Sequence, residues 1–481
     1  MDSISGIVRF IVEEILSEPA LLLGIIVLIG LVALRKPAGD VIGGTLKGIL
    51  GFVILGVGAG AVVAALDPLG TMVLEVFGAQ GVVPTNEAIT AIAAGEFGVT
   101  VAWVMLVGFA INLLLARFTP LKYIFLTGHH MLFMATMLAV VLSAADIVNV
   151  PNVLLGGVLL GTVMVVMPAL GQPFMRRITG DQPVAIGHFG TMGYILAGLA
   201  GKAFGRGSKS TEEMDFPKTF NFLRDPMVAT AVAMLVIYGI FTVWYAQVAT
   251  AEQVAAITGG GDLVVFGLIQ ALTFAAGVAV ILLGVRTILG EIVPAFAGIG
   301  SRIVPNALPA LDCPITFPFA PNAVVIGFLA SFVGGLLSLG ILAATGGLGL
   351  ALALILPGMV PHFFTGGTAG VFGNATGGRV GAVVGGFVNG VFITFGAAFL
   401  LPVMGELGFA NTTFGDADFQ WYGLLVGNVA NLGVPVLYIG LGVIVVGLLA
   451  LGTWVQTRFV PRPRYDVGSS ETPAPKPAAA A

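Results

Sequence analysis

The residues most able to do chemistry in this sequence are histidines and one aspartate that lie within long apolar stretches. The four histidines are His129, His130, His188 and His362, and the aspartate is Asp312. Ionisable side chains are costly inside apolar segments, so by default they mark a substrate or proton pathway. A histidine that only bonds neighbouring helices together would give the same pattern, and this alternative stays open for each of them. Because adjacent residues point about 100° apart on a helix, we expect no more than one of His129 and His130 to face a substrate.

Asp312 lies in the segment LDCPITFPFAPNAVV, which has prolines on both sides of it. Proline forbids a regular helix and leaves backbone carbonyls free, so we expect a shaped backbone in which a carboxylate can accept hydrogen bonds from hydroxyl groups. The alternative role is a salt bridge to Arg302 or Lys202. The neighbouring Cys313 is interpreted as a small buried residue rather than a nucleophile, because no cation stands beside it.

Other kinds of chemistry find no support in the sequence. It has no G-x-x-x-x-G-K-[ST] phosphate loop, its histidines lack zinc spacing, and its single cysteine excludes a disulfide framework. The net charge is −4 and the 20 Lys and Arg residues are scattered, so no basic stripe suits nucleic acid. We therefore expect no metal, no cofactor and no nucleic-acid partner.

The elements that must position the polar residues are membrane helices. Of the 481 residues, 57% are hydrophobic and 9% are charged, against roughly 25% charged in a soluble domain. So few charged residues cannot cover a surface in water, and the 70 glycines fit close helix packing in lipid. The sequence therefore predicts an all-α polytopic membrane protein.

About eleven apolar segments are long enough to span a bilayer as helices. The acidic residues before the first of them argue against a cleavable signal peptide. The predicted spans are Ile15–Leu34, Gly48–Leu66, Gly98–Ala116, Tyr123–Ala145, Val150–Phe174, Met227–Val248, Leu263–Val285, Ala323–Ala343, Gly346–Val360, Val380–Val403 and Gly433–Trp454.

The charges between the spans predict the orientation, because short loops rich in Lys and Arg stay in the cytoplasm. Residues 35–47, 202–224 and 458–464 carry such clusters. The acidic loop with Glu406, Asp416 and Asp418 is then expected outside. These loops place the N-terminus outside and the C-terminus in the cytoplasm, which requires an odd number of spans.

Two segments do not fit the series of spans and are predicted to be re-entrant hairpins, Val184–Ala200 and His362–Gly378. Broken helices at membrane depth survive only where protein or a watery cavity satisfies the backbone, and paired breaks indicate a transporter's substrate site. The two halves start on opposite sides of the membrane, as in an inverted repeat, although no residue-level similarity joins them. We expect Arg286–Leu311 to lie along the cytoplasmic interface and the tail 461–481 to be disordered.

Five motifs in order carry a resemblance to a known family: PALLLG from Pro19, LTGH ending at His129, IGH ending at His188, LDC from Leu311 and FAPNAVV from Phe319. Over residues 15–455 the chain resembles the ascorbate-specific enzyme IIC permeases of the bacterial phosphoenolpyruvate-dependent phosphotransferase system. The resemblance implies a homodimer in the bacterial inner membrane. Each protomer would have a scaffold near residues 15–66 and 227–290, and a substrate-carrying core near 98–201 and 311–403 that moves like an elevator.

The resemblance also implies site residues. His129, His188 and Asp312 match the family's two histidines and its aspartate, and Asn86 with Glu87 fall on its outside-facing Thr-Tyr pair. Phe133, Phe189 and Gly190 replace glutamines, which removes hydrogen-bonding partners from a polyol site, so we expect weak ascorbate binding. The predicted substrate contacts are Asn86, Glu87, His129, His130, Met131, Leu132, Phe133, His188, Phe189 and Asp312.

The function implied is that of a permease for a polyhydroxy, sugar-like substrate, which is L-ascorbate in the family. A separate cytoplasmic IIB subunit, itself supplied by IIA, would phosphorylate the substrate from a phosphocysteine, with Asp312 or His188 as general base. The alternative is a proton- or ion-coupled secondary transporter of the same fold, in which His129, His188 and Asp312 form a proton relay. A purely structural membrane protein is disfavoured, because polar groups stand beside broken helices.

Overall fold

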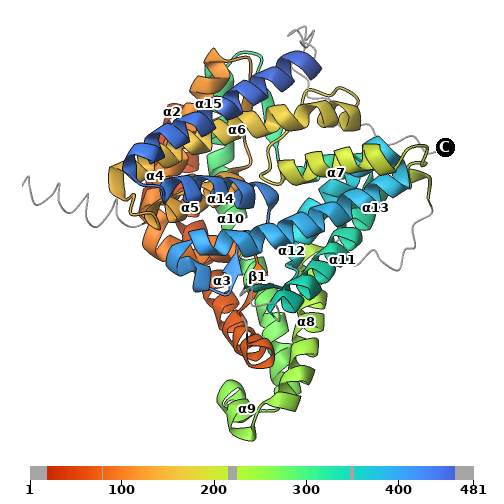
Figure 1. Ribbon diagram of the computed structural model, residues 1–481. Coiled ribbons are helices and arrows are strands. Elements are labelled where there is room, and N and C mark those ends of the chain that lie inside the picture. The colour runs from red at the N-terminus through yellow and green to blue at the C-terminus, as the bar shows by residue number, and fades with distance from the viewer. Residues whose placement is uncertain (1–18, 79, 215–224, 347–351, 461–481) are drawn as a thin grey trace, which may run out of the picture.

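The computed structural model describes residues 19–78, 80–214, 225–346 and 352–460. The predicted tail 461–481 and the first residues of the first predicted span lie outside these ranges. Long helices dominate the described chain (Figure 1), and eight of them are long and apolar enough to cross a membrane. The helices are α2 (Pro19–Ala33), α3 (Ala38–Phe77), α4 (Asn86–Phe118), α5 (Gly128–Ser143), α6 (Asn149–Thr179), α7 (Thr191–Phe204), α8 (Pro226–Val248), α9 (Ala251–Thr258), α10 (Leu263–Ile303), α11 (Pro321–Gly346), α12 (Met359–Pro361), α13 (Gly367–Leu400), α14 (Ala417–Ala430) and α15 (Val434–Phe459).

Most predicted spans fall within observed helices, but two do not. Tyr123–Ala145 begins as a strand and becomes helical only at Gly128. In Gly346–Val360 the described residues are the last residue of α11, the short strand β5 (Leu354–Ile355) and the start of α12, with the helix-breaking pair Pro357-Gly358 between the strand and α12. The helices α2 and α5 have only 15 and 16 residues. Eleven crossings therefore stay a prediction.

The described part of the chain also has six short strands, which the sequence did not predict and which join segments that are far apart in the chain. They are β1 (Gly81–Pro84), β2 (Tyr123–Phe125), β3 (Ala185–Ile186), β4 (Leu308–Leu311), β5 (Leu354–Ile355) and β6 (Thr412–Thr413). They form two parallel three-stranded sheets with the orders β5-β1-β6 and β2-β4-β3. Backbone polar groups away from water must find partners, and strands of two to four residues are too short to show a period in the sequence.

The two predicted hairpins are built from different elements. In Val184–Ala200 the strand β3 ends in a turn at residues 187–190 and leads into α7, which runs on to Phe204, and residues on the two sides of the turn, Val184 and Tyr194 among them, pack in one apolar cluster. The helix α13, in contrast, breaks at Gly377 and Gly378, where Gly378 has φ +56°. A Cβ on Gly373 would collide with the carbonyl oxygen of Gly381, so the two parts of α13 run back along each other. Whether this helical hairpin is re-entrant in a membrane stays a prediction.

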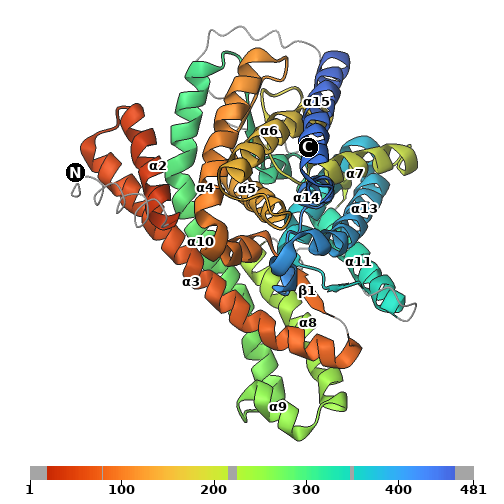
Figure 2. The same cartoon turned by 60° about the vertical axis from the view of Figure 1, so that its left-hand side comes forward.

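The segment Arg286–Leu311, which the sequence predicts to lie along the cytoplasmic interface, is not a separate element, and its place at an interface stays a prediction. Residues 286–303 continue the 41-residue helix α10, and residues 308–311 form β4. The polar residues of this segment did not end the helix, because α10 packs along α3 over much of its length (Figure 2). A lateral contact of this kind is not visible in the local sequence.

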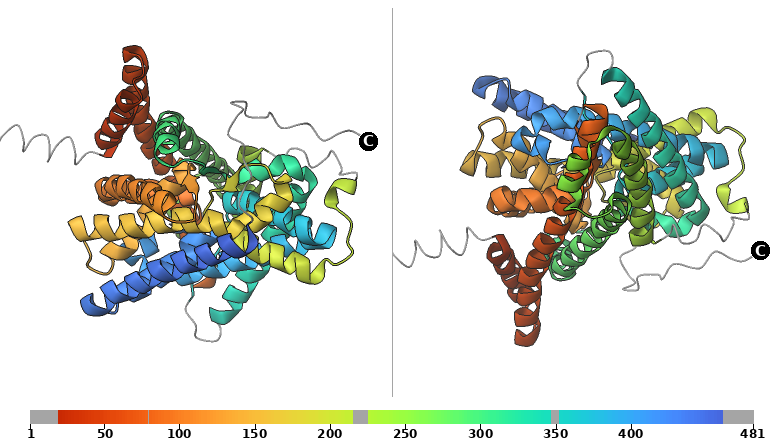
Figure 3. Two further views of the ribbon diagram at one scale, coloured as in Figure 1. Left: turned by 90° about the horizontal axis from the view of Figure 1, so that it is seen from above. Right: turned by 90° about the horizontal axis from the view of Figure 1, so that it is seen from below.

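Apolar side chains of the described residues form two main cores, and each core includes strand residues of one of the two sheets. The larger core lies among α4, α5, α6 and α14, and the second lies among α3, α8, α10 and the β1–β5 pair. The helix α2 and the first part of α3 project from this body (Figure 3). The backbones of α11 and α13 are in direct contact, since a Cβ on Gly390 would collide with the carbonyl oxygen of Ser331.

Candidate functional site

A cavity of about 160 Å³ lies where the strands of both sheets end. Each of the six strands is followed, within five residues, by a residue that lines it. In strand order these residues are Asn86, His129, His188, Asp312, Val360 and Asp416. The remaining lining residues are Glu87, His130, Phe133, Arg286, Pro314, Pro361 and Phe364. The volume is below the roughly 300–1,000 Å³ of drug-sized pockets, so it suits one small molecule.

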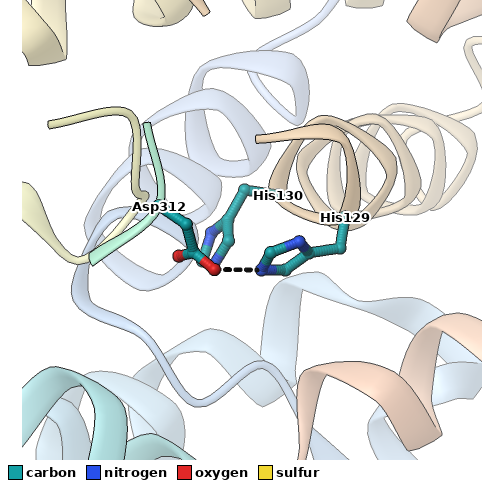
Figure 4. A group of neighbouring side chains, drawn as sticks. All are labelled: His129, His130 and Asp312. Carbon is teal, nitrogen blue, oxygen red and sulfur yellow. Dashed lines mark ion pairs between the residues drawn. The ribbon is translucent and has the colours of Figure 1, made fainter. Parts of the chain in front are cut away.

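The most open polar pair in the cavity is His129 and Asp312. His129 Nε2 lies 3.3 Å from Asp312 Oδ2, and the two side chains are 24% and 37% exposed (Figure 4). The other carboxylate oxygen of Asp312 accepts a hydrogen bond from the Cys313 N–H at 2.7 Å, which caps a short 3₁₀ helix, Cys313–Phe319. Asp312 therefore pairs with a histidine of α5. Of its two predicted partners, Lys202 lies exposed at the end of α7, and the side chain of Arg302 lies outside the described part of the structure.

His130 and His188 are buried beside this pair, and backbone groups determine which of their ring nitrogens carries the proton. The Phe189 N–H donates to His130 Nδ1 at 3.2 Å, and the Gly190 N–H donates to His188 Nδ1 at 3.0 Å. The Tyr194 hydroxyl also lies 2.8 Å from His188 Nδ1. Because Nδ1 accepts in both rings, the neutral form of each carries its proton on Nε2. Both histidines thus present an Nε2–H donor.

The expectation that only one of His129 and His130 faces the cavity is wrong, because both line it. The helix α5 begins at Gly128, so the two rings lie at the helix end, with their centroids 4.8 Å apart. The cavity wraps around that end. A residue at the first turn is not hidden behind later turns of its own helix.

The side chains do not fit a resident metal ion, although their spacing is short enough. Among the described residues, three groups have donor atoms within 4.8 Å of one another: His129, His130 and Asp312; His130, His188 and Asp416; and His188, Asp312 and Cys313. A metal-bound histidine normally donates an N–H from its other ring nitrogen to an acceptor. In His130 and His188 that nitrogen instead accepts from a backbone N–H, so Nε2 keeps its proton. Every group contains one of these two histidines.

Asp416 is a buried part of the site, which corrects its expected place in an outside loop. It is 2% exposed, and its Oδ2 accepts a hydrogen bond from Asn86 Nδ2 at 2.8 Å. Asn86 Oδ1 accepts in turn from the Gly415 N–H at 2.8 Å, so Asn86 joins the start of α4 to the residues before α14. His130 Nε2 lies 3.8 Å from Asp416 Oδ2.

Asp418 is also buried rather than in an outside loop, and it fixes the turn that carries His188. Its carboxylate accepts hydrogen bonds from the N–H groups of Thr191 at 2.9 Å and Met192 at 3.0 Å, which are the first residues of α7. Trp421 Nε1 donates to the same carboxylate at 2.9 Å, and the Asp418 N–H donates to the Phe189 carbonyl at 2.8 Å. A negative group at the start of a helix satisfies its unpaired N–H groups.

Comparison with known proteins identifies the family. Residues 14–418 match the sequence model of a family described as the sugar-specific permease component of the phosphotransferase system (PTS), EIIC-GAT. The chain belongs to this family. A similar curated protein is the ascorbate-specific PTS system EIIC component of Mycoplasma pneumoniae, which is 27% identical over 441 residues, covering 81% of this chain and 66% of the relative. The predicted resemblance is thus confirmed, and the protein is a multi-pass PTS membrane permease component.

The structure brings together seven of the ten predicted contacts of this EIIC chain, since Asn86, Glu87, His129, His130, Phe133, His188 and Asp312 all line the cavity. Three do not line it. Met131 and Leu132 pack into the apolar core, and the ring of Phe189 stacks on Phe125 with a centroid distance of 4.8 Å. Phe189 contributes its backbone N–H and carbonyl instead.

Sequence reasoning missed Arg286, Pro314, Val360, Pro361, Phe364 and Asp416 as lining residues. The signal for Asp416 was present, because Gly-Asp before an apolar run is typical of a helix start. That a helix starts there does not reveal that the start is buried. Val360 and Pro361 carry no polar group, so their types gave no signal.

Proposed function

We propose that this EIIC chain binds one polyhydroxy, sugar-like substrate in the cavity and carries it inward for phosphorylation by a separate IIB subunit, itself supplied by IIA. The observation that carries the proposal is the combination of donors and acceptors on one small cavity. His130 and His188 offer Nε2–H donors, and Asp312 and Glu87 offer carboxylate acceptors. Hydroxyl groups both donate and accept, so a polyol satisfies both kinds of partner.

For the chemical step, Asp312 is better suited than His188 to act as general base. Neutral His188 already carries a proton on the nitrogen nearest the cavity, since its Nδ1 accepts from Gly190 and Tyr194. Asp312 is partly exposed to the cavity and needs only to accept. In this proposal the substrate oxygen forms a bond to phosphorus, the phosphorus–sulfur bond of the IIB phosphocysteine breaks, and Asp312 takes the hydroxyl proton while the thiolate leaves.

The inverted repeat is supported by the strand pairing. The central strand β1 comes from the first half and its neighbours from the second, whereas the central strand β4 comes from the second half and its neighbours from the first. In both sheets the two outer strands begin pairing two residues apart along the central strand, at Gly81 and Val83 in β1 and at Leu308 and Ala310 in β4. A two-fold relation between the halves accounts for this match.

The remaining parts of the proposal concern the molecule in its membrane. The helices α2, α3, α8 and α10 would form a dimer scaffold, and the hairpin-bearing helices α4–α7 and α11–α14 a mobile core in an elevator-like mechanism. The exposed apolar side chains of α8 and α10 support a lipid-facing or dimeric role for the scaffold. The proposed orientation has the N-terminus outside and the C-terminus in the cytoplasm, following the Lys and Arg clusters.

The alternative is a proton- or ion-coupled transporter of the same fold, in which His129, His188 and Asp312 relay a proton. The fixed Nε2–H form of His188 disfavours such a relay, because Nδ1 already accepts from two donors. Proteoliposomes with the chain and a panel of radiolabelled hexoses, hexitols and ascorbate separate the two. We expect phosphorylated product only when phosphoenolpyruvate, IIA and IIB are all present. Accumulation of unmodified substrate driven by a proton gradient alone would favour the transporter.

A further inference from the structure

The cavity has more carboxylates than cations to pair with them. Glu87, Asp312 and Asp416 all line it. His129 lies 3.3 Å from Asp312, and His130, whose Nδ1 accepts a backbone N–H, lies 3.8 Å from Asp416. A histidine cannot balance a carboxylate while it is neutral. Arg286 lines the cavity but is exposed on α10, and no ion pair joins it to a carboxylate among the described residues.

Glu87 is the least satisfied of these groups. Glu87 is only 5% exposed, and its Oε2 has no hydrogen-bond partner in the described part of the chain. Asp416, which is 2% exposed, accepts from the neutral amide of Asn86. A buried carboxylate without a cation is costly, so both groups favour a ligand that brings positive charge and N–H donors.

We infer that the cavity takes a hydroxylated ligand that carries a primary ammonium group, such as an amino sugar, and disfavours a sugar acid. The ammonium group binds at Glu87 and Asp416, and the hydroxyls bind at the Nε2–H groups of His130 and His188 and at Asp312. A sugar acid would bring a further negative charge into a cavity that is already lined by three carboxylates. This inference rests on the proposed function, since it assumes that the cavity holds the transported molecule.

Three probes that differ in one group test it: glucosamine, glucose and glucuronate, each titrated calorimetrically into the purified full-length chain. We expect glucosamine to bind at least tenfold more tightly than glucose, and glucuronate to bind most weakly. Glu87→Gln is expected to lower the glucosamine affinity about tenfold more than it lowers the glucose affinity, so that the preference for glucosamine is lost. The matched control is Glu96→Gln, because Glu96 is exposed on the same helix, α4; it should change nothing.

Equal affinity for glucosamine and glucose would overturn the inference, because it would mean that a proton already neutralises the carboxylates. Tightest binding of glucuronate, or an unchanged preference in Glu87→Gln, would overturn it as well. The titrations need neither phosphoenolpyruvate nor IIB. If the order of affinities is reversed, the inference about the ammonium group fails and the proposed coupling to phosphorylation is not affected. If phosphorylation fails, the order of affinities still tests the inference.

Discussion

The rings of His130 and His188 lie against each other with their centroids 3.7 Å apart, although one belongs to α5 and the other to the turn after β3. Consecutive backbone N–H groups, those of Phe189 and Gly190, donate to the Nδ1 atoms of the two rings. One short turn therefore sets the tautomer of both histidines. Its own position depends on Asp418, which accepts from the next two N–H groups.

This arrangement makes the two amide replacements of His188 unequal. In His188→Gln the side-chain amide reaches the position of Nε2 and can still donate into the cavity, whereas in His188→Asn it reaches only the position of Nδ1. We expect the glutamine variant to keep the substrate affinity of the native chain and the asparagine variant to lose about 2- to 10-fold, the net value of one hydrogen bond. Calorimetric titration of the best-binding sugar measures this. Equal loss in both variants would mean that His188 does not donate from Nε2.

Asp312→Asn should keep the fold but remove a charge-assisted acceptor from the cavity. We expect the loss of about 1.5–3 kcal/mol of binding free energy, or roughly ten- to a hundredfold in affinity, and Asp312→Ala should bind no better. Thermal unfolding measured alongside binding separates this result from a structural role. A folded Asp312→Asn protein with normal affinity would remove this residue from the site.

Of the two phenylalanines that replace family glutamines, only Phe133 faces the cavity. Phe133→Gln should therefore improve ascorbate binding by about 0.5–1.5 kcal/mol, the net contribution of one hydrogen bond. Phe189→Gln serves as the contrast, since its ring is fully buried against Phe125 and should cost stability without improving binding. Ascorbate titrations and melting temperatures of both variants measure this. Improved binding in Phe189→Gln would contradict the placement of its side chain.

Asp418→Ala should destabilise the protein far more than Asp225→Ala, although both aspartates accept from two N–H groups at a helix start. Asp418 is 1% exposed, whereas Asp225 is exposed at the start of α8, where water can replace it. Each buried donor left unpaired costs about 1–3 kcal/mol. Thermal unfolding in detergent compares the pair. Similar melting temperatures would show that water reaches the start of α7.

The sequence by itself determined the solvent, the helical class and the family. A composition with 9% charged residues leaves only the bilayer as surroundings, and apolar runs of membrane-spanning length give most of the long helices. The segments with His129, His188 and Asp312 carried the family resemblance, and the structure places all three on one cavity. The solvent, the helical class and the family are predictable because each depends on short, continuous runs of residues.

Only the tertiary structure decided how the cavity is closed and which partners its polar groups have. The central strand β1 pairs with β5 and β6 from the other half of the chain, and this pairing brings Asp416 beside Asn86. Loop acidity predicted Asp416 to be outside, because a charged residue between apolar runs looks the same whether water or protein surrounds it. The tautomers of His130 and His188 likewise depend on backbone N–H groups of a distant turn. The hydrophobic pattern of a segment indicates which of its faces is apolar, but it does not indicate which other segments that face contacts.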